Sequence, residues 1–300
     1  MRCWSSPVTV GAMSLAASRD AATSFRPPGW AGVGTCALDA IGSRAPDPPS
    51  FQVLPFHVLL LATAGHGAVE VDFFAHSCRP GTLLWIRPGQ ALRVGRNGLT
   101  ASAVTFEPHL AGDEEPAIGR WQLRGEDEDA VISEFTQLAV DCDRHRQGPL
   151  AGELLRHQLR VLQLRIALLG GADTTGPESR TYTRFRSMLE AGHPHSRRVE
   201  DYADELNCSV RTLTRACLSI TGRTAKQVVD DRVALEARRL LACTSLSVAE
   251  VGRHLGFAEP TNFGRFFHRE VGMSPGQFRA DAAHGPRQAI PAQRLPPDRG

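Results

Sequence analysis

The 300-residue chain is twice the usual size of a domain, about 150 residues, and predicts two domains. Hydrophobic residues make up 42% and charged residues 22%, values near soluble globular averages that exclude a fibrous or fully disordered chain. The longest apolar stretch, residues 56–64, is about half the ~18 residues that a membrane helix needs, so we expect no membrane span. Residues 1–30 lack a long apolar segment, so we also expect no secretory signal and a cytoplasmic location.

Charge is distributed unevenly along the chain, although the formal net charge is only +2. Residues 181–280 carry 15 Arg and Lys against 11 Asp and Glu, whereas residues 1–180 carry 16 against 19. A mildly acidic first part followed by a basic part favours a regulatory domain that precedes a nucleic-acid reader.

The first part of the chain changes character at residue 51. Residues 1–50 are rich in Ala, Ser, Gly and Pro without an apolar period, which predicts a disordered extension. Residues 51–125 contain short β-rich segments separated by Gly and Pro turns, which predicts an antiparallel sandwich or small barrel. These segments are residues 56–61, 69–73, 82–86 and 99–106.

Residues 126–175 change to a helical period, with a Gly148-Pro149 break between two predicted helices. The second helix carries an apolar stripe that we place on one helical face. The stripe either covers one face of the barrel or forms the seam of a homodimer, since a leucine-rich helix often exceeds what one small barrel can bury. A linker is predicted at residues 170–177. The stripe consists of Leu150, Leu154, Leu155, Leu159, Leu162, Ile166 and Leu169.

The last third of the chain contains an internal repeat. Residues 199–206 match residues 248–255 at an offset of 49, and residues 213–224 match residues 263–274 at an offset of 50. A repeat of this regularity predicts a duplicated supersecondary unit, here over about residues 196–218 and 247–270.

Each unit is predicted to be a helix, a tight turn and a second helix, which is the helix-turn-helix pattern. In the first unit, Asn207 suits a left-handed stop and Ser209 suits the cap of the next helix. In the second unit, Ser247 caps the first helix and Gly256 ends it.

Small residues stand where the two helices of each unit cross, Ala203 in the first unit and Gly252 in the second. A larger side chain at this point would push the helices apart. Between the units, apolar residues recur at helical spacing over residues 229–241. They predict a rigid helix of about 16 residues, which is ~24 Å long. Because successive major grooves recur every ~34 Å along DNA, such a helix lets one chain contact two adjacent grooves.

The outward residues of each second helix are the predicted DNA contacts. Arginine binds guanine through two hydrogen bonds and asparagine reads adenine, whereas hydroxyl groups suit phosphates. For each arginine the alternative is a plain surface charge or a salt bridge; Arg215 and Arg265 are favoured because they occupy matching positions. The predicted contacts are Arg211, Thr212, Thr214 and Arg215 in the first unit and Thr261, Asn262, Arg265 and His268 in the second.

Several segments match a known family in order and spacing: residues 199–203, 209–215, 247–252, 255–257, 263–267 and 272–279. They resemble the DNA-binding domain of AraC/XylS-type transcriptional regulators, over about residues 182–281. The resemblance implies seven helices with two helix-turn-helix units, and a transcription regulator that binds double-stranded promoter or operator DNA. It also makes RNA polymerase a candidate partner. Cys217, where the family usually has Phe, and Gly264, where a hydroxyl residue is common, depart from the pattern.

The β-rich segment, with its Pro88-Gly89-Gln90 turn, resembles the cupin-like sensor domain that many such regulators carry. This likeness implies a small-molecule effector, of unknown site, or dimerisation. Metal-binding cupins use an HxH pair with a downstream Glu and His, whereas His57, His66 and His76 are isolated, so we expect no metal. The seven cysteines form no CxxC pair and predict no zinc cluster.

Two other classes of protein fit the sequence less well. A cupin-type metalloenzyme with an accessory DNA domain would need the missing metal ligands, and an alkylation-repair protein would need four clustered cysteines near the start of the chain. We therefore expect no enzyme and no cofactor. The predicted fold class is α+β multidomain: a cupin-like antiparallel β-barrel with helices, then an all-α domain with two helix-turn-helix units, then a disordered tail at residues 282–300.

Overall fold

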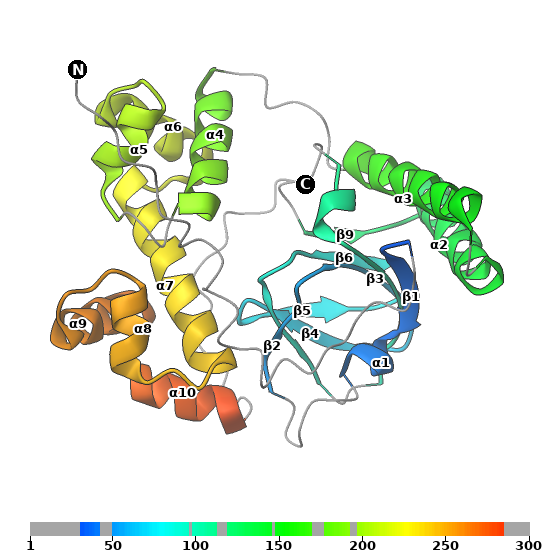
Figure 1. The fold of residues 1–300 in the computed structure, drawn as a ribbon, viewed down its shortest axis with the longest axis horizontal. Helices are drawn as coiled ribbons and strands as arrows, with labels where there is room; N and C mark the ends of the chain where they lie inside the picture. The colour runs from blue at the N-terminus through cyan, green and yellow to red at the C-terminus, as the bar shows by residue number, and fades with distance from the viewer. Residues whose placement is uncertain are drawn as a thin grey trace.

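The computed structural model describes residues 31–42, 50–95, 98–112, 119–145, 148–169, 177–192 and 197–284. Figure 1 shows an antiparallel β domain, a pair of long helices beside it, and a separate group of helices formed by the last third of the chain. This is the fold class that the sequence predicts. Within the described ranges, no helix combines the length and apolar character needed to span a bilayer.

The β domain is a sandwich of two antiparallel sheets around a buried aliphatic core. Strand β3 shows the alternation: Val58 and Leu60 point into the core between the sheets, whereas Leu59 and Leu61 point to the outer face. The first sheet has the order β1 (Val33–Ala37), β8 (Thr100–Phe106), β3 (His57–Ala64), β6 (Thr82–Ile86) and β9 (Arg120–Gln122). The second sheet has the order β2 (Gln52–Val53), β7 (Ala91–Val94), β4 (Gly67–Val71) and β5 (Phe74–Cys78).

The predicted disordered extension over residues 1–50 is wrong for residues 33–42, which form β1 and the short helix α1 (Leu38–Gly42). Strand β1 pairs with β8 in the register Val33↔Phe106, and the Val33 side chain is completely buried. Its partner strand lies far along the chain, so local composition does not reveal it. Residues 1–30 and 43–49 of the predicted extension lie outside the described residues, as do the linker at residues 170–176 and the tail from residue 285. The predicted disordered tail is wrong for residues 282–284, which belong to the last helix of the chain.

Helices α2 (Glu126–Arg144) and α3 (Pro149–Leu169) pack together against the outer face of the first sheet. The prediction of a single apolar face on α3 is wrong, because the helix has two. One face is buried against the sheet and α2 through Leu155, Leu159, Leu162 and Ile166. The other face, which we call the outer α3 face, is solvent-exposed and consists of Leu150, Leu154, Val161, Leu164 and Leu168.

The helical domain has seven helices in the described residues, as the resemblance implies, and α7 lies at its centre (Figure 1). Its first helix begins at Pro177, earlier than the predicted domain start at residue 182. The seven helices are α4 (Pro177–Gly192), α5 (Val199–Glu205), α6 (Val210–Thr221), α7 (Ala225–Cys243), α8 (Val248–His254), α9 (Pro260–Val271) and α10 (Pro275–His284).

The turns of both units follow the predicted chemistry. Asn207 has φ +52° and Gly256 has φ +75°, so each ends its helix in the left-handed region. The Ser209 hydroxyl accepts a hydrogen bond from the backbone N–H of Thr212 at 3.0 Å. Ser247 forms a capping box, in which its hydroxyl and the Glu250 carboxylate each accept a hydrogen bond from the other's backbone N–H.

The close helix crossing predicted at Gly252 is also present. A Cβ atom at this position would lie 3.1 Å from the Cβ of Phe263, which is completely buried in α9. In contrast, a Cβ at Gly264, on the same helix as Phe263, would meet no atom within 4 Å. The two helical glycines therefore have different roles: one permits packing, and the other only weakens its helix.

We predict that Gly252→Leu lowers the free energy of unfolding by about 1–3 kcal/mol, because the added side chain has to displace Phe263. Gly264→Ala is the matched control and should raise the free energy of unfolding by up to about 1 kcal/mol, the helix-propensity difference between Gly and Ala. Urea denaturation followed by circular dichroism measures both changes. Equal effects of the two substitutions would contradict the close-crossing interpretation.

The two domains meet where the β4–β5 hairpin packs on α7. The carboxylate of Asp72, at the hairpin tip, accepts hydrogen bonds from Nε and Nη2 of Arg239, both at 2.8 Å. Gln90 Nε2 and the backbone N–H of Ala91 donate to the same carboxylate. The Asp72 and Arg239 side chains are only 10% and 12% exposed, so the ion pair is nearly buried.

Phe73, the next residue of the hairpin, reaches the helical domain as well. Its ring lies 5.2 Å from that of Phe278 in α10 and 4.5 Å from that of Phe51, measured between centroids. Asp72 and Phe73 have φ of +51° and +69°, values that are uncommon for residues other than glycine. The contacts with α7 and α10 therefore hold a hairpin tip of unfavourable backbone conformation.

We predict that Arg239→Met lowers the free energy of unfolding by about 3 kcal/mol, because it leaves the Asp72 carboxylate buried without its main partner. The double variant Asp72→Asn/Arg239→Met should recover part of this loss, since no buried charge is then left without a partner. The test compares the free energies of unfolding of the wild type, Asp72→Asn, Arg239→Met and the double variant. Strictly additive effects would show that the pair does not couple the domains.

Candidate nucleic-acid interface

The first unit presents its predicted site residues on the outer side of α6. Leu213, Ala216 and Cys217 form the buried side of this helix. The opposite side borders a shallow hollow of about 580 Å³, and all four predicted residues of the unit line it. The lining consists of Val210, Arg211, Thr212, Thr214, Arg215 and Leu218.

Two of these residues already have partners within the protein. The hydroxyl groups of Thr212 and Ser209 lie 2.9 Å apart, so Thr212 takes part in the helix cap. Arg215 Nε lies 3.1 Å from Glu178 Oε1 in the first turn of α4, which is the salt bridge named as the alternative for each arginine. Both side chains are well exposed, 71% for Arg215 and 41% for Glu178. Exposed pairs contribute only about 0–1 kcal/mol, so a phosphate or a base edge can displace Glu178.

The second unit presents its predicted site residues in the same way on α9. Phe263, Phe266 and Phe267 form the buried side of the helix. The four predicted contacts, Thr261, Asn262, Arg265 and His268, are all solvent-exposed. Glu259 precedes the helix without a capping hydrogen bond, and Pro260 occupies the first turn.

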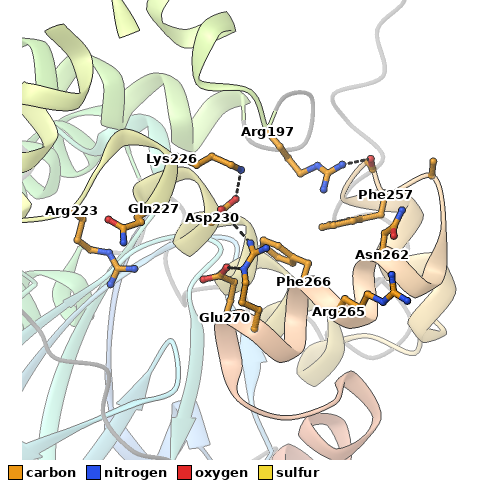
Figure 2. Close-up of a pocket in the computed structure, with 13 residues that line it drawn as sticks. Arg197, Arg223, Lys226, Gln227, Asp230, Phe257, Asn262, Arg265, Phe266 and Glu270 are labelled. Carbon is orange, nitrogen blue, oxygen red and sulfur yellow. Dashed lines mark hydrogen bonds and ion pairs between the residues drawn. The ribbon is translucent and has the colours of Figure 1, made fainter. Parts of the chain in front are cut away.

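A larger hollow of about 940 Å³ lies between the beginning of α7 and the recognition side of α9 (Figure 2). We call it the basic hollow, because basic side chains from three separate segments converge on it. Asn262 and Arg265 are the predicted site residues that it contains. Its lining consists of Arg197, Arg223, Lys226, Gln227, Asp230, Gly256, Phe257, Ala258, Asn262, Arg265, Phe266, Arg269 and Glu270.

The other basic residues of this hollow were not predicted from the sequence. Arg197 lies at the start of the first unit, just before α5, Arg223 and Lys226 belong to the segment that joins the units, and Arg269 is in the last turn of α9. Helical periodicity assigns these residues to separate segments and does not show that they lie close together in space. In the sequence, only Lys226 stood out among these residues, because it is the single lysine of the chain.

Arg197 connects the two units across the hollow. Its Nη2 donates to the carbonyl oxygen of Gly256, in the turn of the second unit, at 2.9 Å. The centre of its guanidinium lies 3.8 Å from the centre of the Phe257 ring. The beginning of the first unit is thereby attached to the turn of the second unit.

His57, one of the three isolated histidines named above, is held by aromatic neighbours in the β domain. The indole N–H of Trp85 donates to Nδ1 of His57 at 3.0 Å, and the His57 ring stacks on Phe106 at 4.7 Å between centroids. Burial, with a smaller contribution from Arg87, lowers the pKa of His57 to about 4, so the imidazole is neutral near pH 7. Within the described ranges, no three His, Cys, Asp or Glu side chains are grouped so that they could hold a metal ion.

Comparison with known proteins agrees with the duplicated units. Residues 202–281 match a family model described as a helix-turn-helix domain. The MmsAB operon regulatory protein of Pseudomonas aeruginosa is 27% identical over 247 residues, 76% of this chain and 76% of that protein. The HTH-type transcriptional activator RhaS of Enterobacter sp. (strain 638) is 25% identical over 152 residues, 50% of this chain and 55% of RhaS. The chain thus spans about half the length of RhaS.

Among solved structures, a transcriptional regulator from Chromobacterium violaceum with an AraC-type DNA-binding domain is 25% identical. The match covers 35% of this chain and 93% of that chain, with a TM-score of 0.33. The sequence match over residues 202–281 lies on α5 to α10, which contain both units. Residues 202–281 carry a helix-turn-helix domain, and an antiparallel β domain precedes it along the chain.

Proposed function

We propose that this protein is a sequence-specific DNA-binding transcription regulator that inserts α6 and α9 into adjacent major grooves of promoter or operator DNA. The observation that carries the proposal is that one helix, α7, packs against both units, while each unit exposes an arginine at a matching position, Arg215 and Arg265. The relatives named above as an operon regulatory protein and a transcriptional activator support this function.

The length of α7 supports simultaneous use of both units. The helix has 19 residues, which corresponds to ~28 Å. This is longer than the ~24 Å expected from the sequence and nearer to the ~34 Å between successive major grooves on one side of DNA. A modest bend of the DNA toward the protein accounts for the remaining difference.

The side chains divide by chemistry into readers of bases and contacts to the backbone. Arg211, Arg215 and Arg265 can each donate two hydrogen bonds to guanine, and Asn262 can read adenine. The hydroxyl groups of Thr212, Thr214 and Thr261, and the ring of His268, suit phosphate oxygens. Of the matched arginines, Arg215 has to leave Glu178 before it reads a base, whereas no ion pair holds Arg265 within the described residues.

We predict that Arg265→Ala weakens binding to a selected operator by about fivefold to 150-fold, the effect of losing about 1–3 kcal/mol of base contacts. The operator is a duplex selected by the full chain from a random-sequence pool, and gel-shift titration measures the affinity. Binding to a scrambled duplex should change little, because the loss concerns base recognition. Arg124→Gln, which removes an exposed charge just before α2, is the control. Unchanged affinity of Arg265→Ala for the operator would refute its assigned role.

We also propose that the β domain regulates DNA binding, through a small ligand or through dimerisation on the outer α3 face. Leu154, Val161 and Leu168 on this face are spaced seven residues apart, and Leu150 and Leu164 lie beside them. A row at this spacing is typical of a helix that pairs with another helix. Leu150 and Leu168 are each 79% exposed, an unusual position for leucine in a protein that acts as a monomer.

We predict that Val161→Glu in the full chain converts a dimer to a monomer, because a charge then lies in the middle of the apolar face. Multi-angle light scattering measures the mass. Ile220→Glu on α6 is the matched control: Val161 and Ile220 are both aliphatic and both 40% exposed. A wild-type chain that is monomeric at all concentrations, or a Val161→Glu variant that still dimerises, would show that the outer α3 face is not the seam.

A further inference from the structure

We infer that the basic hollow receives the sugar-phosphate backbone of duplex DNA between the two major grooves, and that Lys226 donates a hydrogen bond to a phosphate there. The inference rests on the proposed function and adds to it a backbone site outside the two recognition helices.

The net positive charge of the lining favours an anionic partner. The lining contains five basic side chains, namely Arg197, Arg223, Lys226, Arg265 and Arg269, and two carboxylates, Asp230 and Glu270. The excess of positive charge is built from segments far apart in the sequence. Phosphate contacts supply the sequence-independent part of DNA affinity, and Lys and Arg are the side chains that make most of them.

The hollow also borders both proposed recognition helices. Arg223 directly follows Gly222, which ends α6, and Lys226 is in the first turn of α7. On the other side, Asn262 and Arg265 belong to α9 and line the hollow themselves. If α6 and α9 occupy neighbouring grooves, the backbone that separates these grooves passes the surface between the helices, which is where the hollow lies.

Lys226 is suited to a phosphate contact. Its side chain is 57% exposed, and its Nζ lies 2.5 Å from Oδ1 of Asp230, which is 11% exposed. An ammonium group has three N–H donors, and the pair with Asp230 uses one of them. Asp230 Oδ2 also accepts a hydrogen bond from Arg269 at 3.4 Å. The buried carboxylate thus binds two cations, one from α7 and one from α9, and both line the basic hollow.

Arg223 has a different role from Lys226. Its Nη2 donates to Oδ1 of Asp231 at 2.9 Å, and its Nε lies 2.9 Å from the other oxygen of the same carboxylate. A guanidinium that donates a hydrogen bond to a carboxylate and lies within ion-pair distance of its other oxygen is already oriented by the protein. We therefore assign the direct phosphate contact to Lys226 and a more remote electrostatic contribution to Arg223.

The first experiment compares Lys226→Gln with Lys226→Arg in the full chain, with Arg124→Gln as the control of equal charge change. Affinities for the selected operator and for a scrambled duplex of the same length are measured by fluorescence anisotropy at several salt concentrations. We expect Lys226→Gln to reduce the slope of log affinity against log salt by about 0.9, and the affinity at ~0.1 M salt by about fivefold to tenfold. Both duplexes should lose the same factor, and Lys226→Arg should retain the wild-type slope.

The outcomes separate this inference from the proposed function. A steep wild-type slope that is unchanged in Lys226→Gln would overturn the backbone site and leave the proposed function intact. A loss restricted to the operator would assign Lys226 to base reading and also overturn the inference. A wild-type chain that binds neither duplex would overturn both.

The second experiment uses the fact that Lys226 is the chain's single lysine. An amine-selective acylating reagent modifies only this side chain and the terminal amine, and mass spectrometry of the peptides distinguishes the two. We expect bound duplex to slow the acylation of Lys226 while that of the terminal amine stays unchanged, and acylation before mixing to weaken binding as Lys226→Gln does. Equal acylation of Lys226 with and without saturating duplex would refute the contact.

Discussion

The packing of three parts of the molecule on one helix, α7, is the constraint on which the rest of the structure depends. It packs against α5 and α6 of the first unit, against α8 and α9 of the second unit and against α10, and Arg239 on the same helix binds Asp72 of the β domain. A straight helix is a stiff element, so the two units have little freedom to change their separation. A displacement of the β4–β5 hairpin therefore acts on the same helix that sets the spacing of the recognition helices.

If the β domain regulates DNA binding as proposed, this arrangement limits how its signal reaches the candidate interface. The core between the two sheets is filled by aliphatic side chains such as Leu60 and Leu92, and Val71 lies at the end of β4, next to Asp72. A change in this core shifts β4 and with it the hairpin tip. The nearly buried carboxylate of Asp72 does not tolerate a small loss of geometry, because its attraction to Arg239 has to offset the desolvation of both charges. The junction is therefore suited to discrete changes of state rather than to gradual bending.

Local signals in the sequence predicted the helical domain well, because each of its turns is encoded by residues within the turn. Ser209, Ser247, Asn207 and Gly256 act through their own backbone or that of residues three positions away, so the sequence shows them directly. Strand β1 and the second face of α3 were missed for the opposite reason. The partner of β1 is β8, some 70 residues later, and the sheet decides which of two apolar faces on α3 is buried. The helical period alone does not distinguish Leu154 from Leu155.

The candidate interface shows the same division between local and distant information. Outward residues of α6 and α9 follow from the helical period, and the structure exposes the predicted arginines. Their surroundings are not local: Glu178 reaches Arg215 from α4, and Asp230 lies between Lys226 and Arg269. These carboxylates make the two units unequal, although the repeat makes them similar in sequence. The first unit combines an arginine paired with Glu178 and exposed Val210 and Leu218, whereas the second borders the excess of positive charge in the basic hollow. On the proposed function, more of the electrostatic attraction to DNA therefore falls on the second unit.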